Sequence, residues 1–285
     1  MSEPKRKVAV VTDSTSSLTP AMGQQYGVHV MPICVAFGTE EYRDGVDLDS
    51  AAFYQKLRSA KQLPTTSQPT PADFVQTYTA LSQQAEAIVS IHVSQQMSAT
   101  LDSARVASRE LPDIPIHVID SRSVSMGLGL TAIAAAQAAA AGQDADQVVR
   151  LVEGIIPKMN LIFTVDTLEY LRKGGRIGGA TAFLGLALSI KPLLYMRDGR
   201  IEPLEKPRTR ARAVGRLLDL MAERVGTAEG VHVAVLHCAE PDDAQRLAER
   251  VAARFRCEEL LTIEAGPIIG THAGPGTLGV AFYTG

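Results

Sequence analysis

The sequence predicts an α/β protein of two domains, with a parallel sheet in residues 1–155 and a mixed sheet in residues 156–285. In the first half, short apolar runs alternate with helical patterns, and this alternation is typical of a parallel sheet with helices on its faces. After about residue 156 the composition shifts, and an Asp-Gly pair at 198–199 between two apolar runs predicts an antiparallel hairpin. No internal repeat or low-complexity linker interrupts either half.

Four strands are predicted in the first half, at residues 7–14, 29–38, 87–93 and 115–120, with a hairpin turn at 39–45. Their apolar runs end in polar residues, as buried parallel strands do. One helix is expected to begin at residues 49–50, and Thr70, Pro71 and Asp73 resemble a capping-box start of the next helix. Further helices are expected at 98–110 and in the Ala-rich run that ends at Gly142.

The second half is expected to begin with a strand at 160–167 and a short helix that Gly174 ends. The hairpin at 191–206 follows, then a helix at 209–225, a strand at 231–237, a helix at 242–255 and a strand near Leu260. A glycine-rich loop around His272 and a final strand close the chain.

Composition indicates a soluble globular protein, and no cofactor is expected. The chain is 46% hydrophobic and 21% charged with a net charge of −3, which does not suggest a nucleic-acid or membrane-surface partner. The longest apolar stretches are Ala-rich or too short for a stable membrane insertion. The three cysteines lack metal-ligand or disulfide spacing. The short charged N-terminus precedes no apolar signal segment, so a cytoplasmic location is expected.

Hydroxyl side chains gather where the predicted strands end. Four loops carry them, at residues 12–17, 63–71, 94–100 and 121–125. Ser and Thr are ordinary N-caps and turn residues. However, ligands gather at the carboxyl ends of parallel strands, and Ser98 lies near a helix start where free N–H groups could hold an anion. No P-loop, dinucleotide fingerprint, zinc-protease motif or G-x-S-x-G elbow is present.

Six histidines are present, and only His272 lies in a glycine-rich segment, "IIGTHAGPGTLGV". It could be a catalytic base, a metal ligand, an anion-binding donor or a turn residue. A metal site lacks further ligands, and a catalytic base lacks an evident paired nucleophile. An anion-binding donor and a turn residue are therefore favoured over a catalytic base.

Basic residues form the last candidate group. Arg172, Lys173 and Arg176 surround a Gly-Gly turn, and Arg208 lies at a predicted helix start. These residues could be solvated helix ends, or Arg208 could present its planar donors to a carboxylate or phosphate. Together with the hydroxyl loops and His272, the set describes an anion-binding site better than a reaction centre.

These motifs, taken in order, resemble the DegV family of bacterial fatty-acid-binding proteins. The matching segments are "VTDSTSSL", "TTSQPTPADF", "SQQMSATLDSA", "VIDSRSVSMGLG", "LRKGGRIGG" and "GTHAGPGTLGV". The resemblance implies a DegV-like fold of two α/β domains with a long-chain fatty acid between them, its tail in an apolar tunnel.

The resemblance also implies roles for individual residues. Thr66 and Ser98 match hydroxyls that contact the carboxylate, and Arg208 and His272 match groups near it. The further residues predicted for the ligand site are Ser67, Ser94, Gly270 and Thr271.

The implied function is that of the binding subunit of a fatty acid kinase, without catalysis of its own. A separate ATP-dependent kinase subunit would phosphorylate the bound carboxylate, His272 would assist this transfer, and Arg172, Lys173 and Arg176 would dock that subunit. Two alternatives stay open: an acyl hydrolase or acyltransferase that uses Ser98 and His272, and a fatty-acid-responsive regulator.

The sequence departs from the family pattern at the "SQQMSAT" segment. Ala99 stands where the family usually has Gly, and Gln95 and Gln96 replace smaller residues. Thr70 replaces the usual Ser, which is a mild change. The Gln pair is expected to affect the pocket entrance or the choice of acyl chain.

Overall fold

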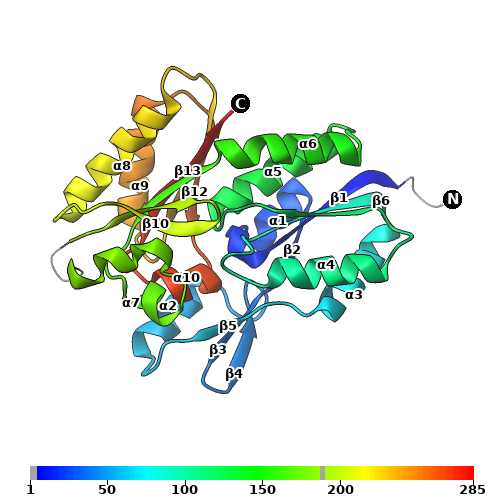
Figure 1. Cartoon of the computed structure of the whole chain (residues 1–285), viewed down its shortest axis with the longest axis horizontal. Helices are drawn as coiled ribbons and strands as arrows, with labels where there is room; N and C mark the ends of the chain where they lie inside the picture. Colours follow the sequence, from blue (N-terminus) through cyan, green and yellow to red (C-terminus); the bar gives the residue numbers. More distant parts are fainter. Residues whose placement is uncertain (1–4, 187–189) are drawn as a thin grey trace.

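The computed structural model describes residues 5–186 and 190–285, and it confirms the predicted α/β class with a parallel N-terminal sheet and a mixed C-terminal sheet (Figure 1). The N-terminal sheet is parallel throughout, in the order β2 (Val28–Met31), β1 (Arg6–Asp13), β6 (Ala85–His92), β7 (Ile116–Asp120). The C-terminal sheet has the order β10 (Arg200–Glu205), β9 (Leu193–Arg197), β8 (Asn160–Thr164), β13 (Leu278–Thr284), β11 (Val231–His237), β12 (Cys257–Glu264). Strands β11 and β12 pair in parallel, and the other neighbours are antiparallel.

The two sheets share a layer of helices. Helices α5 (Met126–Ala140) and α6 (Ala145–Ile155) lie between them, and α5 contacts β1 and β6 on one side and β8, β11 and β13 on the other (Figure 1). The outer face of the first sheet carries α3 (Pro71–Ser82) and α4 (Thr100–Glu110), and that of the second carries α8 (Arg210–Val225) and α9 (Pro241–Arg254). Both sheets are therefore covered on both faces, which explains why β1 is apolar at consecutive positions.

The central core joins both halves. Val8 and Val10 of β1 pack into the same cluster as Leu161 of β8 and Leu236 of β11, with α5 between them. The side chains of α5 are buried nearly all round, and each fully buried Leu or Ile contributes about 1.5–3 kcal/mol relative to exposure. The predicted boundary near residue 155 coincides with the end of α6.

A small antiparallel sheet closes one side of the molecule, in the order β4 (Glu40–Arg43), β3 (Cys34–Phe37), β5 (Thr65–Ser67). It packs with α2 (Ser50–Ser59) against α10 (Pro267–Ala273) of the second half. The remaining helices are α1 (Pro20–Tyr26) and α7 (Glu169–Lys173), and short 3-10 turns cover Ser14–Ser16, Ile156–Lys158 and Gly178–Leu186.

Several predicted boundaries were right because their signals are local. Asp49 caps α2, Thr70 and Asp73 form a reciprocal capping box on α3, and Thr209 caps α8. The Asp-Gly pair is the turn of the β9–β10 hairpin. Helices α1 and α6 are additional to the predicted elements.

Four predictions about elements were wrong. The apolar run at 29–38 is not one strand, because Pro32 separates β2 of the parallel sheet from β3 of the small sheet. The expected turn at 39–45 contains β4. Residues 267–273 form α10 instead of a loop, with His272 in its last turn. Gly174 follows α7 in right-handed conformation, and it is Gly175 that has a positive φ of 72°.

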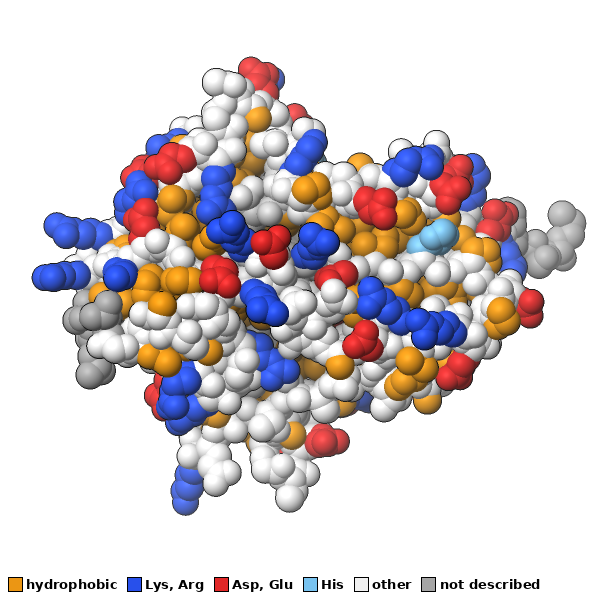
Figure 2. Space-filling model, viewed as in Figure 1, with side chains coloured by type: hydrophobic (Ala, Val, Ile, Leu, Met, Phe, Trp, Pro, Cys, Tyr) orange, Lys and Arg blue, Asp and Glu red, His pale blue; other side chains and the backbone are white. Residues whose placement is uncertain are grey.

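Charged side chains of both signs are interspersed over the face shown in Figure 2. On this face the described residues therefore form no continuous basic surface, in keeping with the net charge of −3. Within residues 5–186 and 190–285, none of the helices combines the length and apolar character needed to cross a membrane.

Candidate ligand site

A cavity lies where the loops of the first half meet α10. Each of the four hydroxyl-rich loops contributes one hydroxyl side chain to its wall: Thr15, Thr66, Ser98 and Ser125. Thr15, Ser98 and Ser125 follow β1, β6 and β7, so they come from the carboxyl ends of neighbouring parallel strands, where ligands are expected. Thr66 comes from β5 of the small sheet.

The rest of the cavity wall is mainly aliphatic. Both halves of the chain contribute to it, so a molecule in the cavity would touch both halves. The apolar lining residues are Ile33, Val93, Met97, Val124, Leu161, Phe163, Leu171, Ile201, Leu236, Ile268, Ile269 and Ala273. Such a wall favours a long apolar ligand, because each buried methylene contributes about 0.8 kcal/mol.

His272 is the imidazole of this cavity, and it is partly buried on α10. Its Nε2 shares a hydrogen bond of 3.0 Å with Oγ1 of Thr66. Its Nδ1 is buried without a hydrogen-bond partner among the described residues, and it faces Gly174 so closely that a side chain there would overlap with it. Burial lowers the pKa of His272 to about 4, and the positive charge of Arg176 acts in the same direction. The ring is therefore neutral at pH 7.

Ser98 lies in the turn before α4, one residue before the N-cap Ala99. Its Oγ shares a hydrogen bond of 2.9 Å with Thr100 Oγ1 and accepts the Thr100 backbone N–H at 3.3 Å. The hydroxyl lines the cavity next to the first turn of α4, where backbone N–H groups favour an anion. Neither nitrogen of His272 bonds to Ser98 or to a carboxylate among the described residues, so the contacts do not form a nucleophile–base–acid chain.

Arg176 is the guanidinium that lines the cavity. Its Nε donates to the Met97 carbonyl at 3.1 Å, and its Nη1 donates to the Gly174 carbonyl at 2.7 Å. It therefore connects the turn before Ser98 to the turn that packs on His272. Of the other two residues predicted to dock a partner, Lys173 pairs with Glu169 at 2.6 Å and Arg172 is exposed.

Arg208, predicted to lie near the carboxylate, is exposed before α8 and does not line this cavity. The family resemblance assigned Arg208 to the head group, and its planar donors at a helix start suited a carboxylate. The nearby Arg210 points elsewhere: it bonds to Asp243 at 3.1 Å and to the Gly276 carbonyl after α10.

The four further residues predicted for the ligand site do not line the cavity either. Ser67 is exposed on β5, and Ser94 is fully buried. Gly270 allows α10 to approach Phe53 and Tyr54 of α2, because a Cβ at this position would clash with both rings. Thr271 is buried, and its hydroxyl donates to the Pro267 carbonyl at 2.9 Å. These residues shape the surroundings of the cavity without facing it.

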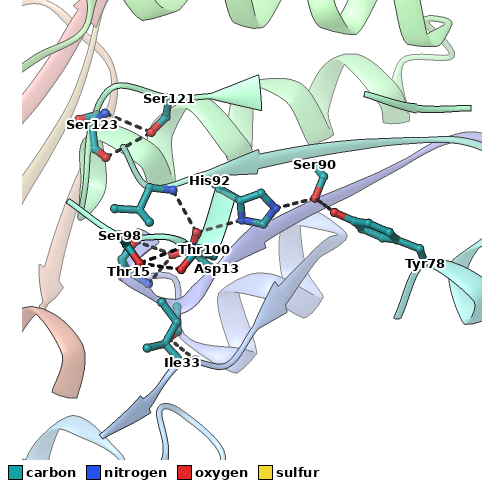
Figure 3. A network of polar contacts seen from close by, with 12 residues as sticks. Asp13, Thr15, Ile33, Tyr78, Ser90, His92, Ser98, Thr100, Ser121 and Ser123 are labelled. Carbon is teal, nitrogen blue, oxygen red and sulfur yellow. Dashed lines mark hydrogen bonds and ion pairs between the residues drawn. The ribbon is translucent and has the colours of Figure 1, made fainter. Parts of the chain in front are cut away.

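A buried polar chain supports Thr15 from behind (Figure 3). Asp13 Oδ1 accepts hydrogen bonds from the Thr15 hydroxyl at 2.5 Å and the Thr15 N–H at 3.1 Å. Its Oδ2 pairs with His92 Nδ1 at 3.0 Å, and His92 Nε2 pairs with Ser90 Oγ at 2.7 Å, which also accepts from Tyr78. Asp13, Ser90 and His92 are completely buried. This chain fixes Thr15 on the cavity wall, because a buried carboxylate must have its hydrogen bonds satisfied.

Sequence reasoning missed Asp13 and Thr15 as individual site residues, although both lie in the quoted segment "VTDSTSSL". An Asp at the end of a buried strand was the available signal. Among the described residues, no group of three or more His, Cys, Asp or Glu side chains could hold a metal ion.

Comparisons with known proteins agree on one family. A family model described as "Uncharacterised protein, DegV family" matches residues 7–285. A DegV domain-containing protein from Streptomyces coelicolor is 43% identical over 277 residues, which cover 96% of this chain and 98% of that protein.

Two solved structures are similar over almost their whole length. A DegV family protein from Thermus thermophilus, described by its fatty acid binding, has a TM-score of 0.93 at 34% identity and covers 98% of this chain and 99% of its own. DegV of Bacillus subtilis, described as a fatty acid binding protein, has a TM-score of 0.91 at 32% identity, with 99% and 100% covered.

Proposed function

The chain belongs to the DegV family, and from this premise we propose that it binds a long-chain fatty acid in the cavity between its two halves. One observation carries the proposal: the wall of the cavity is mainly aliphatic and also contains one cluster of polar side chains. That group consists of Thr66, Ser98, Arg176 and His272, which hydrogen bonds and close packing connect.

The chemistry of this group suits a carboxylate. A carboxylate removed from water needs hydrogen bonds or a paired charge. The hydroxyls of Thr66 and Ser98 supply neutral donors, and Arg176 supplies a positive charge and further N–H groups. His272 is neutral, so it contributes one ring N–H or one lone pair, depending on its tautomer. The apolar wall would supply most of the affinity, and the polar group would orient the head.

Mass spectrometry of the protein purified from a heterologous host tests this proposal. A fatty acid is expected to co-purify in about one equivalent. After delipidation, the protein should rebind a long-chain fatty acid, and the Thr66→Val variant with Ser98→Ala should rebind it more weakly. A pocket that stays empty and refuses added fatty acid would overturn the proposal.

We further propose that the protein presents the bound carboxylate to a separate ATP-dependent kinase subunit. Phosphoryl transfer requires an oriented nucleophile and donors that stabilise the developing charge. His272 lies among the proposed carboxylate ligands, next to the turn after α7. We therefore expect His272→Ala to keep fatty-acid binding within a few-fold and to lose acyl-phosphate formation. Lipid content and phosphate transfer with a cognate kinase measure the two effects, and wild-type turnover in the variant would exclude the role.

The exposed basic residues of α7 are proposed to dock that kinase subunit. Arg172→Glu together with Lys173→Glu should abolish phosphorylation and leave the bound lipid unchanged. Arg176 is kept, because it lines the cavity and its loss would change lipid binding directly. The matched control reverses the charge of two exposed basic residues elsewhere, with Arg150→Glu and Lys158→Glu. If lipid content falls with the α7 variant, the segment serves the cavity and not a partner.

A further inference from the structure

Ser94 organises the turn that carries Ser98. Its carbonyl accepts the backbone N–H groups of Met97 at 2.9 Å and Ser98 at 3.2 Å. Its Oγ accepts the N–H of Gln96 at 3.2 Å. The side chain is completely buried, and it does not line the cavity. One residue therefore fixes the backbone that places the Ser98 hydroxyl on the cavity wall.

The same hydroxyl reaches the other half of the molecule. Ser94 Oγ–H donates at 2.8 Å to the carbonyl of Gly199, in the turn between β9 and β10. Gly199 has a φ of +79° and comes so close that a Cβ would overlap with Ser94 Oγ. Beside this contact, Arg200 donates two hydrogen bonds to Gln96 Oε1, at 3.0 and 2.7 Å. The hairpin turn is thus docked on the turn that carries Ser98.

We propose that Ser94 is a positioning residue, through which the β9–β10 turn sets the place of the Ser98 hydroxyl for a carboxylate. The inference rests on the proposed fatty-acid binding and gives Ser94 a role without ligand contact. A hydrogen bond to a carboxylate weakens steeply when its angle or distance departs from the optimum. Removal of the Ser94 hydroxyl leaves the buried Gly199 carbonyl and the Gln96 N–H without this partner, so the turn shifts to satisfy them.

The Ser94→Ala variant tests this with two ligands, a saturated long-chain fatty acid and the alcohol of the same chain length. Affinity for the acid should fall about ten-fold, which is the scale of one charge-assisted hydrogen bond. Affinity for the alcohol should change roughly two-fold at most, because neutral hydrogen bonds are weaker and the apolar wall is intact. In a Ser98→Ala background, Ser94→Ala should cause no further loss, since it acts through Ser98.

Two further variants keep the test decisive if Ser94→Ala folds poorly. Arg200→Ala, at an exposed position, should weaken the same contact between the β9–β10 turn and the turn that carries Ser98. Affinity should fall less than in Ser94→Ala, and again more for the acid than for the alcohol. Thr131→Ala is the matched control, because it removes a buried hydroxyl that donates to the Gly127 carbonyl at 2.8 Å, away from this turn.

Equal losses of affinity for acid and alcohol, or additive losses in Ser94→Ala and Ser98→Ala, would overturn the role of Ser94. They would leave the proposed fatty-acid binding intact. A wild-type protein that binds neither ligand would overturn the proposed function and the inference with it.

Discussion

At the scale of single residues, the environment of His272 decides what this side chain can do. One ring nitrogen bonds to Thr66, and the other is buried against the backbone of Gly174. Desolvation of the ring and the charge of Arg176 both disfavour the imidazolium. The neutral ring would reach a carboxylate by exchanging its Thr66 hydrogen bond for one to the ligand, and it becomes a stronger donor only when a bound anion raises its pKa.

The titration of His272 is therefore a direct prediction. In the ligand-free protein the imidazole should titrate near pH 4, and Arg176→Gln should raise this pKa only in part, because desolvation is the larger cause. Since the folded-state pKa lies below the usual 6.5, the stability that neutral His272 contributes is lost as the pH falls from about 6.5 to about 4. Nitrogen chemical shifts of the ring between pH 3 and 8 measure the pKa. An ordinary value near 6.5 would contradict this description of the site.

At the scale of elements, α10 shows how distant residues complete a short helix. Gly266 before it makes no side-chain cap, and the carboxylate of Asp44 from the segment after β4 packs against Gly266. The Ser14 hydroxyl and the Ile268 N–H favour the ionised form of Asp44, whereas burial and the charge of Asp13 oppose it. Burial prevails and raises the pKa of Asp44 to about 7. The start of the helix that carries His272 is thus tied to the first half of the chain.

This burial predicts a pH-dependent effect of Asp44→Asn. Because the folded-state pKa is raised from 3.8 to about 7, the folded state binds more protons in that window, and wild-type stability falls as the pH rises through it. Asn does not titrate. The melting temperature of Asp44→Asn relative to wild type should therefore increase from pH 4 to pH 7 and then level off. Asp113→Asn, at an exposed turn, should show no such trend. A difference that is constant with pH would refute the raised pKa.

Features that depend on neighbouring residues could be predicted from the sequence, whereas α10, which depends on distant residues, could not. Caps such as Thr70 on α3 and the Asp198–Gly199 turn depend on neighbouring residues, so local patterns identified them. The segment 267–273 contains glycine and has its supporting residues far away in Asp44 and α2, so it was predicted as a loop. The convergence of the hydroxyl-rich loops could be predicted because ligands bind at the carboxyl ends of parallel strands. This rule does not say which hydroxyl of each loop faces the cavity. For that reason Ser94 was assigned to the site and Thr15 was not.

At the scale of the whole molecule, the two halves are joined by a common layer. Helix α5 packs on both sheets, α6 packs on α5 and β6, and the core cluster around α5 includes Val10 from β1 and Leu236 from β11. The cavity wall also draws on both halves. An apolar ligand there would add contacts to both halves at once, and the loss of either sheet would expose the side of α5 that packs on it.

This architecture predicts one cooperative unfolding transition in calorimetry, with a midpoint that rises when a long-chain fatty acid is added. A ligand that binds only the folded state stabilises it by about 2.7 kcal/mol at a hundred-fold excess over Kd. Because the ligand would touch both halves, the whole transition should shift without splitting. The Thr66→Val variant with Ser98→Ala should reduce the shift, since the carboxylate would lose two donors. Two transitions, of which the fatty acid moves only one, would show that the halves unfold independently and that the ligand binds within one of them.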